Sequence, residues 1–464
     1  MMKLPNRLGL ALLFVIPAAL GSTPAENLAE AVRFKTISFQ DRSQIDYEQF
    51  GALNAFLTET YPRVFSELQV ESVSGYSWLI RWPGIDESLS PVLFTAHTDV
   101  VPVEPGTEAD WSYPAFAGVV ADGRVYGRGT LDDKQGVISL LEAAEQLLAE
   151  GYQPAREIVF AFGHDEEISG LQGAGVIAQR MEALGLQFDW MVDEGGLVLS
   201  DSPVLPGKSL AMINVAEKGY LTLTLTAQGT GGHSSSPPRV STIGSLSNAL
   251  AKIEANPFAP KLEEPVRSFL ETLAPHVEQP NQFLFSNLWL TDWLVASQMA
   301  KETLTQPMVR TTTALTMFNA GVKENVIPQR AEAKVNFRLL PNDTPEDVIE
   351  AIEAIIDDPS ITVSHDRWNQ RPGIADMQGS GFEVISEAVH SVYPDAVVVP
   401  SLLQATTDTR HYVGLARNQY RFHGTEMRPE QTGSIHGTDE YISIASLNKT
   451  VAVAVEMLRL GGAR

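Results

Sequence analysis

Short apolar runs alternate with helical patterns between residues 91 and 200. The stretches "PVLFTAHTDVV", "REIVFAFGHDEE" and "FDWMVDEGG" predict three buried strands. Between them, "GAGVIAQRMEALG" predicts one helix, and "DKQGVISLLEAAEQLLAEG" predicts another that Gly151 would end. The second of these helices carries a single apolar face made of Val137, Leu140, Leu141, Ala144, Leu147 and Leu148. Strands that alternate with helices indicate an α/β domain with a mostly parallel central sheet.

The pattern changes after residue 215. "GYLTLTLTAQG" and "EAKVNFRLLP" alternate apolar and polar residues, as strands with one face in water do, and a helical region lies between them. This predicts a smaller inserted α+β lid domain over residues 216–340. After it, "TPEDVIEAIEAII" resumes the helix–strand alternation, and "SLNKTVAVAVEMLRL" predicts a terminal helix. The catalytic domain is therefore predicted to be discontinuous, over residues 23–215 and 341–464.

The N-terminal stretch "MMKLPNRLGLALLFVIPAALGS" has two basic residues, Lys3 and Arg7, before an apolar run over residues 8–20. That run is short for a membrane-spanning helix and is typical of a secretory signal, so residues 1–22 predict export to the periplasm or the medium. The alternatives are an uncleaved N-terminal membrane anchor and a buried helix. No other stretch of the chain is apolar for long enough to span a membrane.

The amino-acid composition restricts the partners and the metal ligands that this protein can use. The chain has 464 residues, a net charge of -24 and no cysteine. So acidic a protein is poorly suited to nucleic acid or to anionic membrane surfaces, because phosphates would be repelled. Without thiolates, any metal has to be held by histidine, aspartate and glutamate.

Acidic residues and histidines gather where the predicted strands end. "AHTDV", "GHDEE" and "VDEGG" each follow one of the three strands, "GRGTLDDKQG" precedes a helix, and "SIHGTDE" precedes the last helix. Ligands of open α/β sheets bind at the carboxyl ends of the strands, so these segments predict one site. Taken alone, "GHDEE" could be a solvated acidic loop. Together the segments offer enough carboxylate and imidazole ligands for a dinuclear metal site.

The chain resembles the zinc aminoacylase/carboxypeptidase metallopeptidase family, in particular carboxypeptidase S and the secreted N-fatty-acyl-amino-acid hydrolase. The resemblance runs in family order from about residue 93 to residue 440. The segments that carry it are "HTDVVPV", "VYGRGTLDDK", "GHDEE", "VDEGG", "EKGY", "GHSSSPP", "RTTTALTMFNAGVKENVIP", "VNFRLLP", "TDTRHY" and "IHGTDE".

The resemblance implies two Zn²⁺ ions, which Co²⁺ or Mn²⁺ could replace, and a role for each matching residue. The implied metal ligands are His97 and Asp193 for one ion, Glu167 and His436 for the other, and Asp132 as the bridge. Glu166 would be the general base, because a carboxylate engaged by metal cannot easily accept a proton. Asp99 would orient the imidazole of His97. The peptide bond between Asp132 and Asp133 would be cis.

Further residues are implied for the substrate. His233 of "GHSSSPP" would stabilise the oxyanion, although the segment alone reads as a polar turn. In dimeric relatives this histidine reaches the partner subunit's site, which suggests a homodimer through the lid domain. In a monomer, the chain's own lid would have to swing in. Asn325, Arg338 and Arg410 match substrate contacts, and the arginines could equally form ordinary ion pairs.

The apolar segment "FLFSNLWLTDWLVASQM" sets Phe285, Trp289 and Trp293 four residues apart. It predicts either the core of the lid or a groove for a long acyl chain.

The leading hypothesis is a metallohydrolase that cleaves an amide next to a free carboxylate, in an N-acyl amino acid or a short peptide. Deacylase and carboxypeptidase activity both remain open. The alternatives are a dinuclear phosphoesterase and a catalytically inactive binding protein of the same fold.

Overall fold

A computed structural model describes residues 22–202, 204–368 and 372–463 of the chain. The predicted export signal therefore lies almost entirely outside the described residues. Within those ranges, no helix is both long and apolar enough to cross a membrane.

A ten-stranded sheet forms the centre of the catalytic domain, with the order β1-β2-β6-β3-β7-β17-β9-β8-β18 and with β16 also paired to β9. The strands β6, β3, β7 and β17 are mutually parallel, and antiparallel pairs occur on both sides of them. The expected mostly parallel sheet is thus found at its centre. The strands of this sheet are β1 (Gln69–Val73), β2 (Ser77–Trp82), β3 (Val92–His97), β6 (Ile158–Gly163), β7 (Phe188–Asp193), β8 (Leu197–Leu199), β9 (Leu210–Glu217), β16 (Val397–Leu403), β17 (Ala416–Arg421) and β18 (Glu426–Met427).

Helices cover both faces of this sheet, because its central strands are apolar on both sides. Phe94 and Phe160 face a large core that includes residues of α1, α4, α12 and α13, whereas Leu93 and Val159 face a second core that includes residues of α5. The predicted helix after "LDDK" is α4. The helices of this domain are α1 (Pro24–Arg33), α2 (Tyr47–Thr60), α3 (Pro62–Glu67), α4 (Lys134–Ala149), α5 (Ala174–Ala183), α12 (Ser380–Val392) and α13 (Ile444–Ala463).

A small sheet stands beside the central one and joins the two segments of the catalytic domain. Its order is β19-β5-β4, formed by β4 (Val119–Ala121), β5 (Arg124–Tyr126) and β19 (Tyr441–Ser443). It therefore brings the chain near residue 440 next to the loop that precedes α4.

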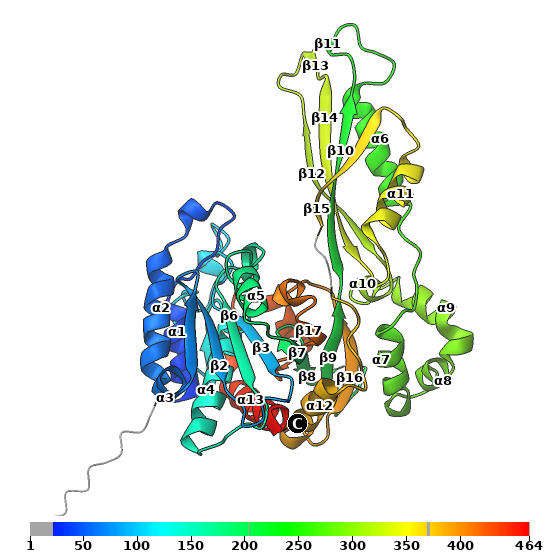
Figure 1. Cartoon of the computed structure of the whole chain (residues 1–464). Helices are drawn as coiled ribbons and strands as arrows, with labels where there is room; N and C mark the ends of the chain where they lie inside the picture. The colour runs from blue at the N-terminus through cyan, green and yellow to red at the C-terminus, as the bar shows by residue number, and fades with distance from the viewer. Residues whose placement is uncertain (1–21, 203, 369–371, 464) are drawn as a thin grey trace, which may run out of the picture.

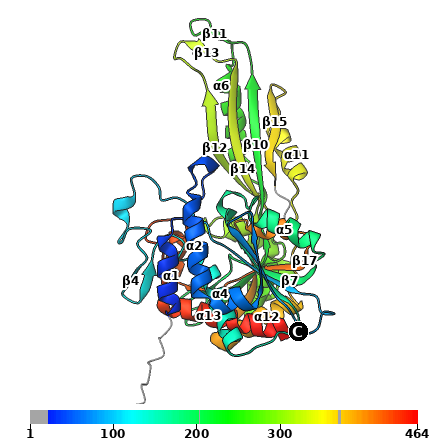
Figure 2. The same cartoon turned by 60° about the vertical axis from the view of Figure 1, so that its left-hand side comes forward.

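A second domain projects from the catalytic domain (Figure 1). Its antiparallel sheet has the order β12-β14-β10-β15, and β11 pairs with β13 at the tip that is farthest from the catalytic domain (Figures 1 and 2). Two helices pack over a separate apolar core on this sheet. The elements are β10 (Gly219–Gln228), β11 (Gly232–His233), α6 (Thr242–Ala255), β12 (Thr312–Ala320), β13 (Val326–Ile327), β14 (Arg330–Leu339), α11 (Pro345–Ile356) and β15 (Ile361–Trp368).

The predicted boundary at residue 340 needs correction. Strand β15 pairs with β10, and Val348, Ile352 and Ile356 of α11 lie in the core of the second domain. The second domain therefore continues to the end of β15. The helical period of "TPEDVIEAIEAII" predicts α11, but an apolar face does not reveal which of two sheets it will cover.

The predicted inserted domain also contains a separate helical segment, made of α7 (Val266–Leu273), α8 (Asn281–Ser286), α9 (Leu288–Met299) and α10 (Gln306–Val309). Residues of this segment share an apolar core with Ala216 of β9 and Leu402 of β16. The segment therefore packs against the catalytic domain, beside the root of the second domain (Figure 1).

Candidate functional site

His97 is the centre of a first group of possible metal ligands. It is the last residue of β3, and its imidazole is 2% exposed. Its Nε2 lies 2.9 Å from Oδ1 of Asp132 and 3.4 Å from Oε1 of Glu194. Together His97, Asp132 and Glu194 have the spacing to hold one metal ion.

A second group shares Asp132 with the first. The Nε2 of His436 lies 3.0 Å from Oδ2 of Asp132 and 3.2 Å from Oε1 of Glu167. Asp132, Glu167 and His436 could hold another ion. The two oxygens of Asp132 thus point to different histidines, which is the arrangement that a bridging carboxylate requires.

Asp99 holds the first histidine and the acidic turn together. Its buried Oδ1 lies 3.3 Å from Nδ1 of His97 and accepts the backbone N–H of Glu166 at 3.1 Å. Its Oδ2 accepts the backbone N–H of Glu167 at 3.1 Å and the hydroxyl of Ser38 at 2.7 Å. Glu166–Ile168 forms a 3₁₀ turn after β6, and this turn brings the two adjacent glutamate side chains into one cavity instead of onto opposite faces of a strand.

Glu166 is buried beside other charged groups. Its Oε1 lies 3.5 Å from Nη2 of Arg410, which is also 3.5 Å from Oδ1 of Asp408. Burial, and then the negative charges of Asp408 and Glu194, raise the pKa of the Glu166 carboxyl well above its usual range. A carboxyl group with a raised pKa is suited to accept and return a proton near neutral pH.

The loop that carries Asp132 is anchored by a buried ion pair. The carboxylate of Glu440 accepts the backbone N–H groups of Gly129 at 3.0 Å and Leu131 at 2.7 Å, and it lies 2.6 Å from Nη1 of Arg128. The peptide bond between Asp132 and Asp133 is cis, as the resemblance implied. Glu440 and Arg128 were not singled out from the sequence, although both lie in the motifs "IHGTDE" and "GRG".

The donor set fits a pair of cations. Among the described residues, Oδ2 of Asp193 is buried without a hydrogen-bond partner, and the buried Oε1 of Glu167 has its contact at 3.2 Å with Nε2 of His436. Burial and the charge of Asp132 raise the pKa of Glu167 to about 7, and the same two causes raise that of Glu194. Divalent metal ions would balance the negative charges of these closely spaced carboxylates, which together with imidazole are the ligands available in a chain without thiolates.

Asp193 stands apart from both groups, although it ends β7 directly before Glu194. It is buried, and among the described residues it belongs to neither group of possible metal ligands. Glu194, and not Asp193, therefore belongs to the group of possible ligands around His97. Adjacent residues at a strand end face opposite sides, so the sequence could not decide between them.

A cavity of about 210 Å³ opens at the two groups. Asp132, Glu166, Glu167, Glu194 and His436 form its polar wall. Its apolar lining residues are Leu131, Leu197, Leu403, Met427 and Ile435. No lysine or arginine is among the residues that line this cavity, whereas four carboxylates are.

Three of the predicted substrate residues lie in the second domain. His233 is exposed in β11, and its strand pairs with β13 next to Asn325, whose carbonyl accepts the N–H of Ser234. This pair lies at the far tip, well away from the catalytic cavity (Figures 1 and 2). Arg338 lies at the root of the domain instead, over the ring of Tyr220 at 4.8 Å.

Glu217 connects that root to the loop of Arg410. It is the last residue of β9, directly before the second domain, and it is 1% exposed. Its Oε2 accepts the N–H of Thr407 at 3.2 Å and the hydroxyl of Thr409 at 3.0 Å, and it lies 3.3 Å from Nη2 of the buried Arg421. Thr407 in turn accepts Nη1 of Arg410 through its carbonyl at 2.9 Å. Glu217 is the first residue of the motif "EKGY". No property of the sequence indicates that it contacts the loop of Arg410.

The substitution Glu217→Gln should lower kcat by about tenfold to a hundredfold, as loss of a partner that orients site residues commonly does. The charge opposite Arg421 would be lost, so the loop that presents Arg410 to Glu166 would be held less firmly. Steady-state kinetics and the melting temperature measure the two effects separately. A control that adds Arg421→Met should recover much of the melting temperature, because it removes the unpaired buried charge, but not kcat. Unchanged kcat in Glu217→Gln would contradict this role.

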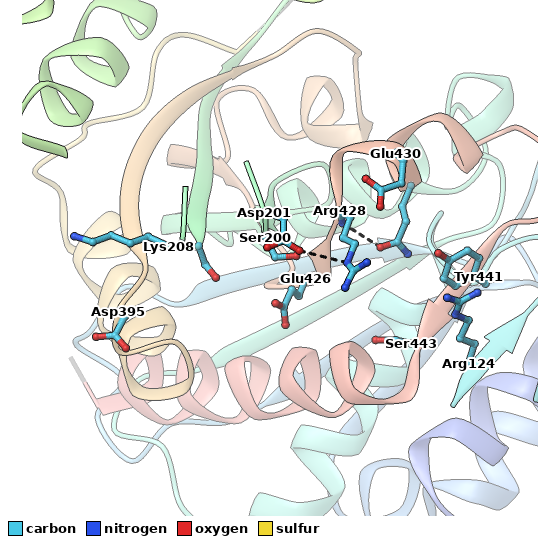
Figure 3. Close-up of a pocket in the computed structure, with 13 residues that line it drawn as sticks. Arg124, Ser200, Asp201, Lys208, Asp395, Glu426, Arg428, Glu430, Tyr441 and Ser443 are labelled. Atoms are coloured by element: carbon cyan, nitrogen blue, oxygen red, sulfur yellow. Dashed lines mark hydrogen bonds and ion pairs between the residues drawn. The ribbon is translucent and has the colours of Figure 1, made fainter. Parts of the chain in front are cut away.

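A larger cavity of about 660 Å³ opens on the other side of β18 (Figure 3). Met427 lines the catalytic cavity, whereas its neighbours Glu426 and Arg428 line the larger one. Charges of both signs surround it, and Arg428 lies 3.6 Å from Asp201. None of the predicted site residues lines this cavity, so it is separate from the candidate site.

The fold and the site together define a metal-binding α/β enzyme. Comparison with known proteins identifies its family. The chain belongs to Peptidase family M20/M25/M40, whose model matches residues 93–460. The sequence resemblance to zinc metallopeptidases of this kind is thereby confirmed.

Individual relatives agree with this assignment. The chain is 38% identical to "Probable carboxypeptidase S-like 2" of Dictyostelium discoideum over 92% of this chain and 83% of the relative. It is 37% identical to the N-fatty-acyl-amino acid synthase/hydrolase PM20D1 of Bos taurus over 94% of this chain and 87% of the relative. The M20 family metallo-carboxypeptidase Sso-CP2 of Sulfolobus solfataricus shares the fold, with a TM-score of 0.70 at 19% identity over 95% of this chain and 99% of that structure.

Proposed function

We propose that this chain is a dinuclear zinc hydrolase that cleaves an amide bond next to a free carboxylate. The observation that carries the proposal is the pair of His/carboxylate groups that share Asp132, with the buried Glu166 beside them. The family and the two relatives described above support an acyl-amino-acid or C-terminal peptide substrate.

The proposed ligands follow from the geometry of the two groups. His97, Asp132 and Glu194 would hold one zinc ion, and Asp132, Glu167 and His436 the other. Asp193, the ligand expected from the resemblance, remains the alternative to Glu194. Zinc in such a site supplies Lewis-acid polarisation of the substrate carbonyl and makes water more acidic.

Glu166 would move the protons of the reaction. It accepts a proton from the attacking water and returns it to the leaving amine, so its carboxyl must stay free of metal. The Asp99 carboxylate supports this division, because it fixes the backbone of both glutamates and the ring of His97 at the same time.

The carboxylate of the substrate would be bound near the root of the second domain. The Arg410 guanidinium lies 3.5 Å from Oε1 of Glu166, which belongs to the wall of the cavity. Arg338 is close enough that the charges of Arg410 and Glu217 influence its pKa, which burial lowers. A carboxylate placed between the two guanidinium groups would relieve their mutual repulsion.

The proposal is tested with a panel of substrates on the zinc-loaded enzyme. The panel crosses acyl chain length with amino-acid identity and includes dipeptides. We expect hydrolysis of N-acyl amino acids or dipeptides with a free carboxylate, and at least about a hundredfold lower kcat/KM for the matching carboxamides, in which the ionic contact to arginine is lost. Equal rates for acids and carboxamides, or hydrolysis of phosphoesters alone, would overturn it.

The position of His233 favours catalysis by a homodimer. His233 lies in β11, next to Asn325, and β11 is at the tip of the second domain, far from the central sheet (Figure 1). The edge strand β12 of the same domain exposes Leu315, Met317 and Phe318. Pairing of β12 with its copy in a second chain would cover these side chains and extend both sheets. In such a dimer the tip of one chain can reach the other chain's cavity.

Mixing two inactive variants distinguishes a shared site from a site within one chain. The His233→Ala variant keeps the proposed metal ligands and Glu166. The Glu166→Gln variant keeps His233 at the tip of the second domain. After the chains are exchanged at equal amounts, half of the dimers are mixed and each has one complete site, so about a quarter of the wild-type kcat should return. No recovery in a mixture whose chain exchange has been verified would show that His233 does not act across the dimer.

A further inference from the structure

Helix α9 is apolar on the side that faces solvent as well as on the side that packs. Leu288, Val295 and Ala296 are buried, and the first two belong to the apolar core shared with neighbouring helices and with the catalytic domain. On the other side Trp289 is 78% exposed and Trp293 is 70% exposed. Helices that are apolar all round are normally enclosed by protein or lipid.

The exposed side chains form one surface, which we call the tryptophan face. Its members are Trp289, Leu290, Trp293 and Leu294 of α9, and Phe283 of the preceding helix α8 is also exposed. Those of α9 recur at positions i, i+1, i+4 and i+5, so they share one side of the helix. The sequence offered two interpretations of this segment, a lid core and a groove. The structure supports neither for Trp289 and Trp293, because both protrude into solvent. Large exposed apolar surfaces mark sites of interaction.

The tryptophan face carries no charge, although the chain has a net charge of -24. The other exposed residues on this side of α9 are Ser297 and Gln298. The single charged residue of the helix, Asp292, lies 3.1 Å from Nη2 of Arg267. One cation lies at the margin of this side, Lys301, whose Nζ donates to Oε1 of Gln298 at 3.4 Å. A single lysine contributes little attraction to anionic phospholipids in so acidic a protein, so the uncharged face is better suited to an uncharged or zwitterionic partner.

The shape of this region also restricts the partner. Helices α8 and α9 lie at the outer side of the molecule, away from the central sheet (Figure 1). The α9 helix has 12 residues, too few to cross a bilayer. A short helix can instead lie in the plane of the interface, where its apolar face enters the boundary between headgroups and acyl chains. Tryptophan is the side chain that favours this boundary, because its ring is apolar and its N–H remains near water.

We infer that the tryptophan face docks the protein on the surface of a zwitterionic lipid bilayer. The inference goes beyond the proposed hydrolase activity and does not depend on it. Protruding indole rings suit a fluid lipid surface, whereas a second copy of this chain would have to offer hollows that match them. Export, predicted from the N-terminal stretch, would bring the protein to a membrane.

The test is co-flotation of the full chain, as the cell processes it, with phosphatidylcholine vesicles. The double substitution Trp289→Ser with Trp293→Ser should lower the vesicle partition coefficient by at least about tenfold, since each indole loses the burial of a large apolar surface. Bromine-labelled phosphatidylcholine should quench part of the tryptophan fluorescence of the wild type and less of that of the variant. Raising the salt concentration should leave binding unchanged, because no ionic contact is involved.

The matched control is Ile85→Ser with Val120→Ser, which removes two exposed apolar side chains from the catalytic domain. It should bind vesicles as the wild type does. The melting temperature should be the same in all three proteins, because the altered side chains are exposed. The inference is overturned if the wild type does not float, if the tryptophan variant floats equally well, or if binding needs anionic lipid. It is also overturned if sedimentation shows a self-association that only the tryptophan variant loses.

Discussion

Replacement of Glu166 by glutamine should lower kcat by about a hundredfold to ten-thousandfold while the chain keeps its metal, as expected when a general base is removed. Glutamine has nearly the same shape but cannot accept the proton of the attacking water. The backbone contacts of residue 166 with Asp99 do not involve its side chain, so the turn should remain in place. The test is to measure kcat for hydrolysis of the best substrate in steady-state assays and to measure the metal content of the same samples.

The neighbouring glutamate is the matched control. Glu167→Gln should also be inactive, but because metal is lost, since Glu167 belongs to one of the two ligand groups and Glu166 to neither. High zinc concentration should therefore restore part of the activity of Glu167→Gln and none of that of Glu166→Gln. Full activity of Glu166→Ala would refute the proposed mechanism.

The substitution Asp132→Asn should weaken the binding of both zinc ions by more than about a hundredfold, which exceeds the effect usual for residues that only orient ligands. Asp132 is the one residue common to both groups. An amide lacks the charge that a bridging ligand needs, so neither ion would be held well. Metal analysis after dialysis, and zinc titrations of activity, measure the loss.

Two further substitutions decide which acidic residue of "VDEGG" is the ligand. Glu194→Gln should lose about one equivalent of zinc, whereas Asp193→Asn should retain both, because Glu194 lies 3.4 Å from Nε2 of His97 and Asp193 is outside both groups. The reverse result would support the assignment made from sequence resemblance. Retention of two ions in Asp132→Asn would contradict the bridging role.

Much of the fold and of the site was accessible from local patterns. Three apolar runs, each followed by polar residues, predicted β3, β6 and β7 and placed their ends at one edge of a sheet. Parallel neighbours end on the same side, so His97, Glu166 and Glu167 had to be close together. The helical period of α4 was equally clear, because its apolar residues repeat at the spacing that one buried face requires.

Other features depend on which segments pack together. The sequence pattern predicts that helix α11 and strand β15 belong to the catalytic domain. In the structure, β15 pairs with β10 and α11 packs in the core of the second domain. The tryptophan face could not be told from a buried stripe, because apolar residues at helical spacing look alike whether or not another element covers them.

The sequence by itself determined the chemistry of this protein. Without cysteine, and with histidines and carboxylates at strand ends, only an imidazole–carboxylate centre was available. The family resemblance then implied a ligand and a base in the adjacent glutamates of "GHDEE". Tertiary structure decided the geometry. It turned Glu194 toward His97, tied Glu217 to the loop of Arg410, and carried His233 to a tip remote from the cavity. The reason is that residue type and local period are properties of one segment, whereas direction and distance arise only when separate segments pack.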